Sequence, residues 1–340
     1  MKGALMAAEM AEQPAVLGSL LQRQAEISDV VRAVMPQRLH GAVLIARGSS
    51  DNAALYGRYL LEMVMRRPVS LASPSVHTLY RADVDHAGYL AIAVSQSGQT
   101  PEIVSVLERM RASGAHTLAI VNSRDSPLAA VAQGVIELRA GDEHAVPSTK
   151  TFTATLLALA LMASANGAAP WTQDELCSIP EQCAALLADQ ARVSDVAALL
   201  AGCDRMVAIA RGILLAAASE TALKIRETTS LFAEAASVAD LRHGPIAAVI
   251  HGVPVLAFSA PGPGAEDVAS MVAELRAKGL PVATISGSED ADLPLPAELP
   301  EALQPITASI RGQQVAMCTA LARGLDPDAP PGLSKVTLTR

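Results

Sequence analysis

The chain has 340 residues and a formal net charge of -8; 51% of its residues are hydrophobic and 18% are charged. This length supports two domains with full hydrophobic cores, and this composition excludes a disordered chain. The charge is spread along the sequence, without a Lys/Arg-rich run interleaved with aromatic residues, so we expect no nucleic-acid partner.

Cysteine usage and hydropathy predict a cytoplasmic protein. The cysteines have no CxxC or zinc-ligand spacing, so we expect buried free thiols in a reducing compartment. They are Cys177, Cys183, Cys203 and Cys318. The segment Met1–Met10 lacks the apolar core of a signal peptide, and the Ala/Leu run Leu156–Ala165 is too short to span a bilayer, so no membrane partner is expected. The seven histidines show no metal-ligand spacing, and neither a metal nor a redox cofactor is expected.

The first half of the chain alternates predicted helices and strands. In chain order these are a helix over Val16–Val34, a strand over Ala42–Ala46 that ends at Arg47-Gly48, a helix over Asn52–Met65, a strand over Leu90–Val94, a helix over Glu102–Ser113 and a strand over His116–Val121. Alternation of this kind predicts a parallel sheet covered by helices on both faces.

The loop Ser95-Gln96-Ser97-Gly98-Gln99-Thr100-Pro101 lies between one of these strands and the helix that follows it. Hydroxyl and amide side chains meet there with the free N–H groups of a helix start, which favours an anion such as phosphate. Thr100 suits the N-cap, Pro101 the first helical position and Glu102 the first turn. An ordinary polar loop between a strand and a helix remains the alternative on this evidence.

The second half repeats the pattern of the first. Its predicted elements are a strand over Met206–Ala210 that ends at Arg211-Gly212, a helix over Leu214–Thr228, a strand over Pro254–Phe258, a helix over Ala265–Lys278 and a strand over Leu280–Ser286. Helices over Thr151–Ala165 and Glu181–Ala201 are expected between the halves, and an extended tail over Asp326–Arg340 with the alternating run Val336–Thr339. The predicted fold is α/β, with two tandem doubly wound parallel sheets of the flavodoxin-like, three-layer α/β/α type.

Only the first half carries hydroxyl-rich turns, which suggests that it binds the anion while the second half supplies other groups. Glu220, Lys224 and Glu227 have the spacing that places two carboxylates and an ammonium on one face of a predicted helix. A solvated salt-bridge stripe is the more common meaning of such spacing. His243 precedes Gly244-Pro245, so it lies on a turn from which it can titrate near neutrality, although a surface histidine fits as well.

Four motifs in fixed order carry a resemblance to a known family: Ser95–Thr100, Val146-Pro147-Ser148-Thr149-Lys150, Glu220–Glu227 and Arg242-His243-Gly244-Pro245. Together they resemble the sugar isomerase (SIS) family, specifically the isomerase half of glucosamine-6-phosphate synthase. The resemblance covers nearly the whole chain. The synthase carries an N-terminal glutaminase domain with a nucleophilic cysteine, whereas the first cysteine of this chain is Cys177. We therefore expect no glutaminase domain and no ammonia from glutamine by that route.

The resemblance implies roles for individual residues. The implied phosphate-binding positions are Ser50, Ser95, Gln96, Ser97 and Thr100, and the implied sugar-binding positions are Gly48, Ser49, Val146 and Ser148. Glu227 matches the carboxylate that moves a proton between C1 and C2, and Lys224 is its companion. His243 matches a ring-opening histidine that reaches into the neighbouring subunit's site, and Lys335 matches a lysine of the tail that closes over the sugar. Arg211 and Glu234 match motif positions without an assigned role.

The expected organisation has four parts: an N-terminal helical segment (1–37), a phosphate-binding SIS domain (38–170), a linker helix with a second SIS domain that holds the catalytic helix and the histidine loop (171–325), and a tail over the active site (326–340). The resemblance implies a phosphosugar substrate, a homodimer with a shared active site, and glucosamine-6-phosphate deaminase activity. A fructosamine-6-phosphate deglycase and a galactosamine-6-phosphate deaminase would use the same groups. A non-catalytic sugar-phosphate sensor is the alternative from another class.

Overall fold

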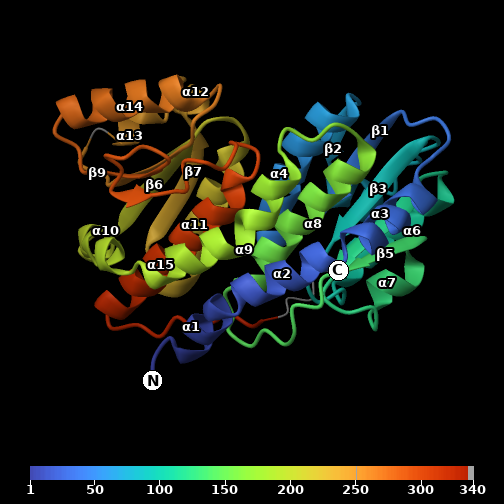
Figure 1. Cartoon of the computed structure of the whole chain (residues 1–340), viewed down its shortest axis with the longest axis horizontal. Coiled ribbons are helices and arrows are strands. Elements are labelled where there is room, and N and C mark those ends of the chain that lie inside the picture. Colours follow the sequence, from blue (N-terminus) through green and yellow to red (C-terminus); the bar gives the residue numbers. More distant parts are fainter. Residues whose placement is uncertain (250, 336–340) are drawn as a thin grey trace. The chain divides into compact units, whose positions relative to one another are not determined.

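A computed structural model describes residues 1–249 and 251–335 (Figure 1). The chain divides into two compact units, each built around one sheet. The first-sheet unit comprises Val16–Glu143 and Lys150–Ala169, together with residues 336–340, which lie outside the described part. The second-sheet unit comprises Met1–Ala15, His144–Thr149 and Pro170–Lys335.

The first sheet is parallel and has the strand order β2-β1-β3-β4-β5. Its strands are β1 (Gly41–Ile45), β2 (Val69–Leu71), β3 (Tyr89–Val94), β4 (His116–Val121) and β5 (Gly134–Glu137). Strands β1, β3 and β4 are almost entirely apolar because helices bury both of their faces.

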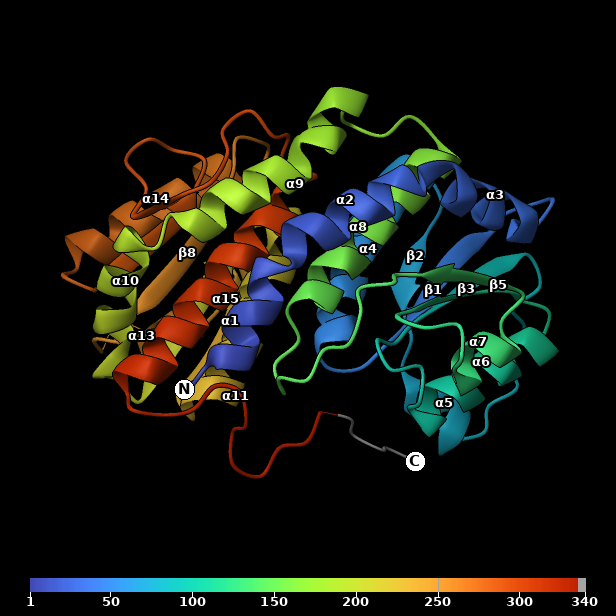
Figure 2. The ribbon, with the colours of Figure 1, turned by 60° about the horizontal axis from the view of Figure 1, so that its bottom comes forward.

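Two groups of helices cover this sheet, as Figure 2 shows. One face carries α3 (Gln24–Val34), α4 (Ser49–Met65) and α8 (Lys150–Asn166). The other carries α5 (Pro74–Thr78), α6 (Pro101–Ala112) and α7 (Pro127–Val131).

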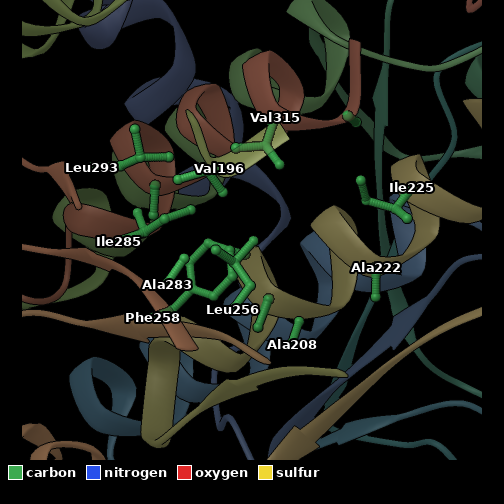
Figure 3. Packing of buried hydrophobic residues seen from close by; sticks show 14 of the residues in the cluster. Val196, Ala208, Ala222, Ile225, Leu256, Phe258, Ala283, Ile285, Leu293 and Val315 are labelled. Atoms are coloured by element: carbon green, nitrogen blue, oxygen red, sulfur yellow. The ribbon is translucent and has the colours of Figure 1, made fainter. Parts of the chain in front are cut away.

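The second sheet is also parallel, with the order β10-β9-β8-β6-β7. Its strands are β6 (Arg205–Ala210), β7 (Phe232–Ser237), β8 (Val255–Ser259), β9 (Val282–Ser286) and β10 (Leu293–Pro294). One face packs against α10 (Ala191–Ala201), η1 (Gly212–Leu214), α11 (Leu215–Thr229) and α15 (Gln304–Ala322). Figure 3 shows this core, in which Leu256, Phe258 and Ile285 of the sheet belong to the same buried cluster as Ile225 and Val315 of the covering helices.

The opposite face of the second sheet carries α12 (Val238–Arg242), α13 (Ile246–Val249) and α14 (Ala265–Ala277). The unit also contains α1 (Ala4–Ala11) and α9 (Gln173–Ala188), and α2 (Gln13–Gln22) begins in it and continues into the first-sheet unit. In each sheet the first strand in sequence lies between the second and the third, which gives the flavodoxin-like order 2-1-3-4-5 twice. The predicted fold class and the predicted duplication are confirmed.

Several predicted helices have different bounds in the structure. The stretch Val16–Val34 is not one helix, because the chain breaks at Arg23 between α2 and α3. The stretch Glu181–Ala201 divides into α9, which starts earlier at a capping box on Thr172, and α10. Helix α15 has no counterpart among the predicted elements. It is buried on nearly every side, so it lacks the one-sided apolar pattern by which surface helices are recognised.

The cysteines are free, as expected, but their burial was predicted wrongly for most of them. Cys183 alone is buried, Cys177 is exposed, and Cys203 and Cys318 are half-buried. None of the described helices is both long and apolar enough to cross a membrane. Residues 325–335 form neither helix nor strand, as predicted for the tail, while the run Val336–Thr339 lies outside the described residues.

Candidate functional site

The predicted phosphate-binding residues lie at the carboxyl ends of two neighbouring strands in the first-sheet unit. Gly48, Ser49 and Ser50 follow β1 and begin α4, while the loop Ser95–Thr100 joins β3 to α6. Strand order reverses between β1 and β3, and ligands of doubly wound sheets bind at this switch point. The structure therefore brings these residues to the edge where the N-termini of α4 and α6 favour an anion.

Internal hydrogen bonds shape the Ser95–Thr100 loop. The Ser95 hydroxyl accepts from Gly98 N at 3.2 Å, and the Ser97 hydroxyl accepts from Gln99 N at 3.2 Å. Gly98 has a φ of +61°, and a Cβ there would lie 2.5 Å from the Ser126 hydroxyl, so only glycine fits this turn. Thr100 occupies the N-cap position of α6 as predicted, but its side chain makes no capping bond to the helix.

An ion pair that sequence reasoning missed connects the two loops of this edge. Arg47, after β1, donates from Nε and Nη2 to the two carboxylate oxygens of Glu102 in the first turn of α6, at 3.0 and 3.1 Å. The Glu102 hydrogen bond raises the pKa of Arg47 above its usual value. A bidentate pair of this kind fixes geometry as well as charge, so Arg47 holds the start of α6 against the β1 loop.

The second half keeps the same ion pair without the hydroxyl-rich loop. Arg211 follows β6, and its Nε lies 3.1 Å from Asp267 in the first turn of α14. Gly48 and Gly212, the glycines after the two arginines, have φ values of +58° and +66°. The repeated Ala-Arg-Gly sequence was the signal that could have identified this connection. Its retention indicates a scaffolding role, which also accounts for Arg211.

Val146 and Ser148 lie in the segment His144–Thr149 of the second-sheet unit, which forms neither helix nor strand and bends at residues 145–147. Burial alternates along this segment: Ala145, Pro147 and Thr149 are buried while Val146 and Ser148 are partly exposed. The two predicted sugar-binding residues are therefore less buried than the three residues beside them.

The charged triad of the second-sheet unit lies on α11 and is not a solvated stripe. The side chains of Glu220 and Lys224 are each 1% exposed, whereas that of Glu227 is 22% exposed. Lys224 Nζ lies 3.4 Å from Glu220 Oε1 and 2.5 Å from Glu227 Oε2. Burial of this extent excludes the solvated salt-bridge stripe. Of the two carboxylates, only that of Glu227 is partly open to solvent.

Close packing of α15 against α11 contributes to this burial. A Cβ on Gly312 of α15 would collide with the Thr221 hydroxyl of α11, so glycine lets the two helices approach. The Thr228 hydroxyl also lies 3.4 Å from the Ala316 carbonyl. Nothing in the local sequence distinguishes Gly312 from other glycines, because its partner lies on a helix 91 residues earlier in the chain.

The electrostatics of the triad keep Lys224 charged. Burial by itself would lower the pKa of Lys224, but the charges of Glu220 and Glu227 outweigh it and raise the pKa above its usual value. A buried ammonium with two carboxylate partners is stable only while it is protonated. The cluster therefore presents a fixed positive charge beside the partly exposed Glu227 carboxylate.

His243 is not part of this cluster within its own unit. It caps the C-terminus of α12, where its main-chain N donates to the Asp240 carbonyl at 3.0 Å. Its side chain is exposed and forms no hydrogen bond or ion pair with the residues the structure describes. Helices α11 and α12 cover opposite faces of the second sheet. Lys335 is half-buried at the end of the described tail. Residues 1–249 and 251–335 contain no group of three or more His, Cys, Asp or Glu side chains able to hold a metal ion.

Fold and site together define an α/β protein with the phosphosugar isomerase fold, built from two copies of one parallel-sheet domain. The SIS domain family model matches residues 40–165 and 199–322. The chain therefore belongs to the SIS domain family.

Comparison with known proteins gives relatives along nearly the whole chain. A glutamine–fructose-6-phosphate aminotransferase (isomerizing) from Methanothermobacter thermautotrophicus is 33% identical over 338 residues, which cover 97% of this chain and 56% of the relative. The chain thus spans a little over half the length of the curated relatives it matches.

Solved structures show the same fold. A protein from Silicibacter pomeroyi, described provisionally as a phosphosugar isomerase, has 29% identity and a TM-score of 0.83 over 96% of this chain and 100% of its own. A glucosamine-6-phosphate deaminase from Thermotoga maritima has 22% identity and a TM-score of 0.75 over 95% of this chain and 99% of its own, a likeness in fold.

Proposed function

We propose that this chain is a glucosamine-6-phosphate deaminase, which converts glucosamine 6-phosphate and water to fructose 6-phosphate and ammonia. The observation that carries the proposal is the buried cluster on α11, where Glu220 and Lys224 are sealed and Glu227 alone reaches solvent. A carboxylate beside a fixed cation can take a proton from carbon while the cation stabilises the negative charge that develops.

The phosphate end of the substrate is assigned to the loops after β1 and β3. Two helix N-termini and the hydroxyls of Ser50, Ser95, Ser97 and Thr100 provide donors for a phosphate there. Phosphate binding would contribute by anchoring the substrate, without taking part in the proton transfer. The name of the Methanothermobacter relative, which pairs isomerisation with fructose 6-phosphate, supports this substrate class.

The proposed chemistry consists of proton transfers followed by hydrolysis of an imine. His243 opens the sugar ring by shifting a proton between the ring oxygen and the anomeric hydroxyl. Glu227 removes the C2 proton, which the C1 carbonyl acidifies, and the charge of the buried Lys224 offsets the negative charge that develops on O1. Glu227 then returns this proton to C1, while O1 gains a proton and the C2 nitrogen loses one, which leaves a hydroxyl on C1 and an imine on C2. Water adds to the imine, and ammonia leaves as the C2 ketone forms.

Mass action supports the direction of the reaction. Water is in large excess over free ammonia in any aqueous compartment, so hydrolysis of the C2 imine is favoured over its formation. Proton transfers of this kind run in both directions, and the residues assigned here catalyse both equally. Fructosamine 6-phosphates and galactosamine 6-phosphate pass through closely related intermediates and are therefore included in the test.

We further propose a homodimer in which His243 serves the site of a second copy. The exposure of His243, and its position on the face of the sheet opposite to α11, support this assignment. Mixing a Glu227→Gln chain with a His243→Asn chain would then restore activity, to about one quarter of the wild-type level, because half of the dimers would hold one intact site. Failure of mixed dimers to regain activity would exclude the shared site.

The decisive experiment measures ammonia release from glucosamine 6-phosphate, galactosamine 6-phosphate, N-acetylglucosamine 6-phosphate and a fructosamine 6-phosphate, with the Glu227→Gln variant as the matched control. Release from glucosamine 6-phosphate alone supports the deaminase. Turnover of the fructosamine conjugate alone identifies a deglycase instead. If the protein binds these sugar phosphates but turns over none of them, it is a sugar-phosphate sensor and not an enzyme.

A further inference from the structure

The segment that follows α15 is fastened to the N-terminal end of α1. Asp328 Oδ1 accepts a hydrogen bond from Met6 N at 2.8 Å, and its Oδ2 accepts one from Leu5 N at 3.0 Å. Asp326 Oδ1 accepts from Gly3 N and from Asp328 N, each at 3.1 Å. The first turn of α1 is thus capped by carboxylates from the other end of the chain.

These contacts provide hydrogen-bond acceptors for the free N–H groups at the start of α1, which no side chain of the helix itself caps. The N-cap residue of α1 is Gly3, which offers no side chain, and the first turn contains no acidic residue. The free N–H groups of a helix start favour an anion, and here Asp328, which is 9% exposed, supplies it. The same hydrogen bonds, from Asp328 N and Gly3 N, lower the pKa of Asp326 below its usual value.

Asp328 also contacts the segment predicted to bind the sugar. Its main-chain carbonyl accepts a hydrogen bond from Val146 N at 3.1 Å. Glu9 of α1 holds the neighbouring residue, since its carboxylate accepts from Ala145 N at 3.2 Å. One residue, Asp328, therefore joins α1, the Val146 backbone and the chain that reaches Lys335 seven residues later.

We propose that Asp328 is a positioning residue, which fixes both the segment that carries Lys335 and the segment that carries Val146 and Ser148 on the N-terminal turn of α1. The catalytic part of this inference rests on the function proposed above for Lys335. Helix α1, which contains none of the proposed catalytic groups, then becomes part of the apparatus that holds them.

The test replaces Asp328 with Asn in the full-length protein. This change keeps the shape of the side chain but turns one of its two accepting oxygens into a donor that faces a backbone N–H. Asp290→Asn, the same chemical change in an exposed loop, is the matched control. The first readout is the rate of trypsin cleavage after Lys335, measured by mass spectrometry. The second readout is a pair of constants measured for each variant: kcat, and the inhibition constant of inorganic phosphate.

Loss of the charged cap is expected to accelerate cleavage after Lys335 by about tenfold. Displacement of Lys335 is expected to lower kcat by about tenfold or more while the phosphate inhibition constant stays within about twofold. Asp290→Asn should change neither. If Asp328→Asn does not fold, Asp326→Ala carries the same test with a smaller expected increase in cleavage, because it removes only the bonds from Gly3 N and Asp328 N.

Unchanged cleavage after Lys335 would overturn the proposal, and so would faster cleavage with an unchanged kcat. The cleavage arm requires no turnover. If the wild-type protein acts on none of the sugar phosphates, the proposed function fails, while the anchoring of the tail by Asp328 is still decided by proteolysis.

Discussion

Replacing Lys224 with Met tests the buried cluster on α11 most directly. Methionine matches the length of lysine but removes the charge, so it leaves Glu220 without a cation in a site where the side chains are 1% exposed. Breaking a buried ion pair by removal of one partner costs about 3–5 kcal/mol, because the remaining charge loses its counter-charge without gaining water. Glu227, at 22% exposure, loses less because it reaches water.

This loss is a large fraction of the stability of an ordinary domain, which is about 5–15 kcal/mol. With a urea dependence of about 3 kcal/mol per molar, it shifts the midpoint of unfolding down by about 1–2 M. The only tryptophan of the chain, Trp171, belongs to the second-sheet unit that contains α11, so its fluorescence reports the unfolding of that unit.

The double variant Glu220→Gln/Lys224→Met supplies the control. Neutralising Glu220 removes the uncompensated charge, so the double variant should recover a substantial part of the stability lost in Lys224→Met. A midpoint for Lys224→Met within about 0.3 M of wild type would refute the reasoning, since a loss below about 1 kcal/mol is typical of a solvated pair.

Four further predictions concern the site and its scaffold. Glu227→Gln should lower kcat by about 10²–10⁴-fold while sugar-phosphate binding persists, and wild-type turnover would remove Glu227 from its role. Ser97→Ala should mainly raise KM, by about five- to tenfold, and a fall in kcat alone would contradict a phosphate-binding role. Arg47→Met should destabilise its unit more than Arg211→Met does its own, because the carboxylate partner is 8% exposed in the first pair and 58% in the second; equal losses would refute this. Because folding raises the pKa of Lys224, its stabilisation is complete below its usual value of 10.5 and decreases as the pH rises from there through the raised value. Urea midpoints measured from pH 9 upward should show this decrease, and Lys224→Met should lack it.

The structural features that depend on local sequence were predicted well. The β3 strand and the Ser95–Thr100 loop follow from an apolar run that ends at hydroxyl residues and Pro101, and the structure places them as expected. The triad spacing likewise determined which face of α11 carries the charges. A helix of fixed period places Glu220, Lys224 and Glu227 together wherever it packs.

Only the tertiary structure decided the burial and the partners of these groups. Burial of Glu220 and Lys224 depends on α15, a helix whose uniform burial leaves no periodic signal in the sequence. The pairing of Arg47 with Glu102 joins residues 55 positions apart, and the bonds between Asp328 and the start of α1 join residues more than 320 apart. Hydropathy patterns indicate which face of a segment is buried, but not which distant residue packs against it. The sequence of this chain by itself therefore determined its two sheets and the chemistry of its loops, while chain folding over long separations decided which charges are sealed, which carboxylate is open, and how the two ends of the chain are joined.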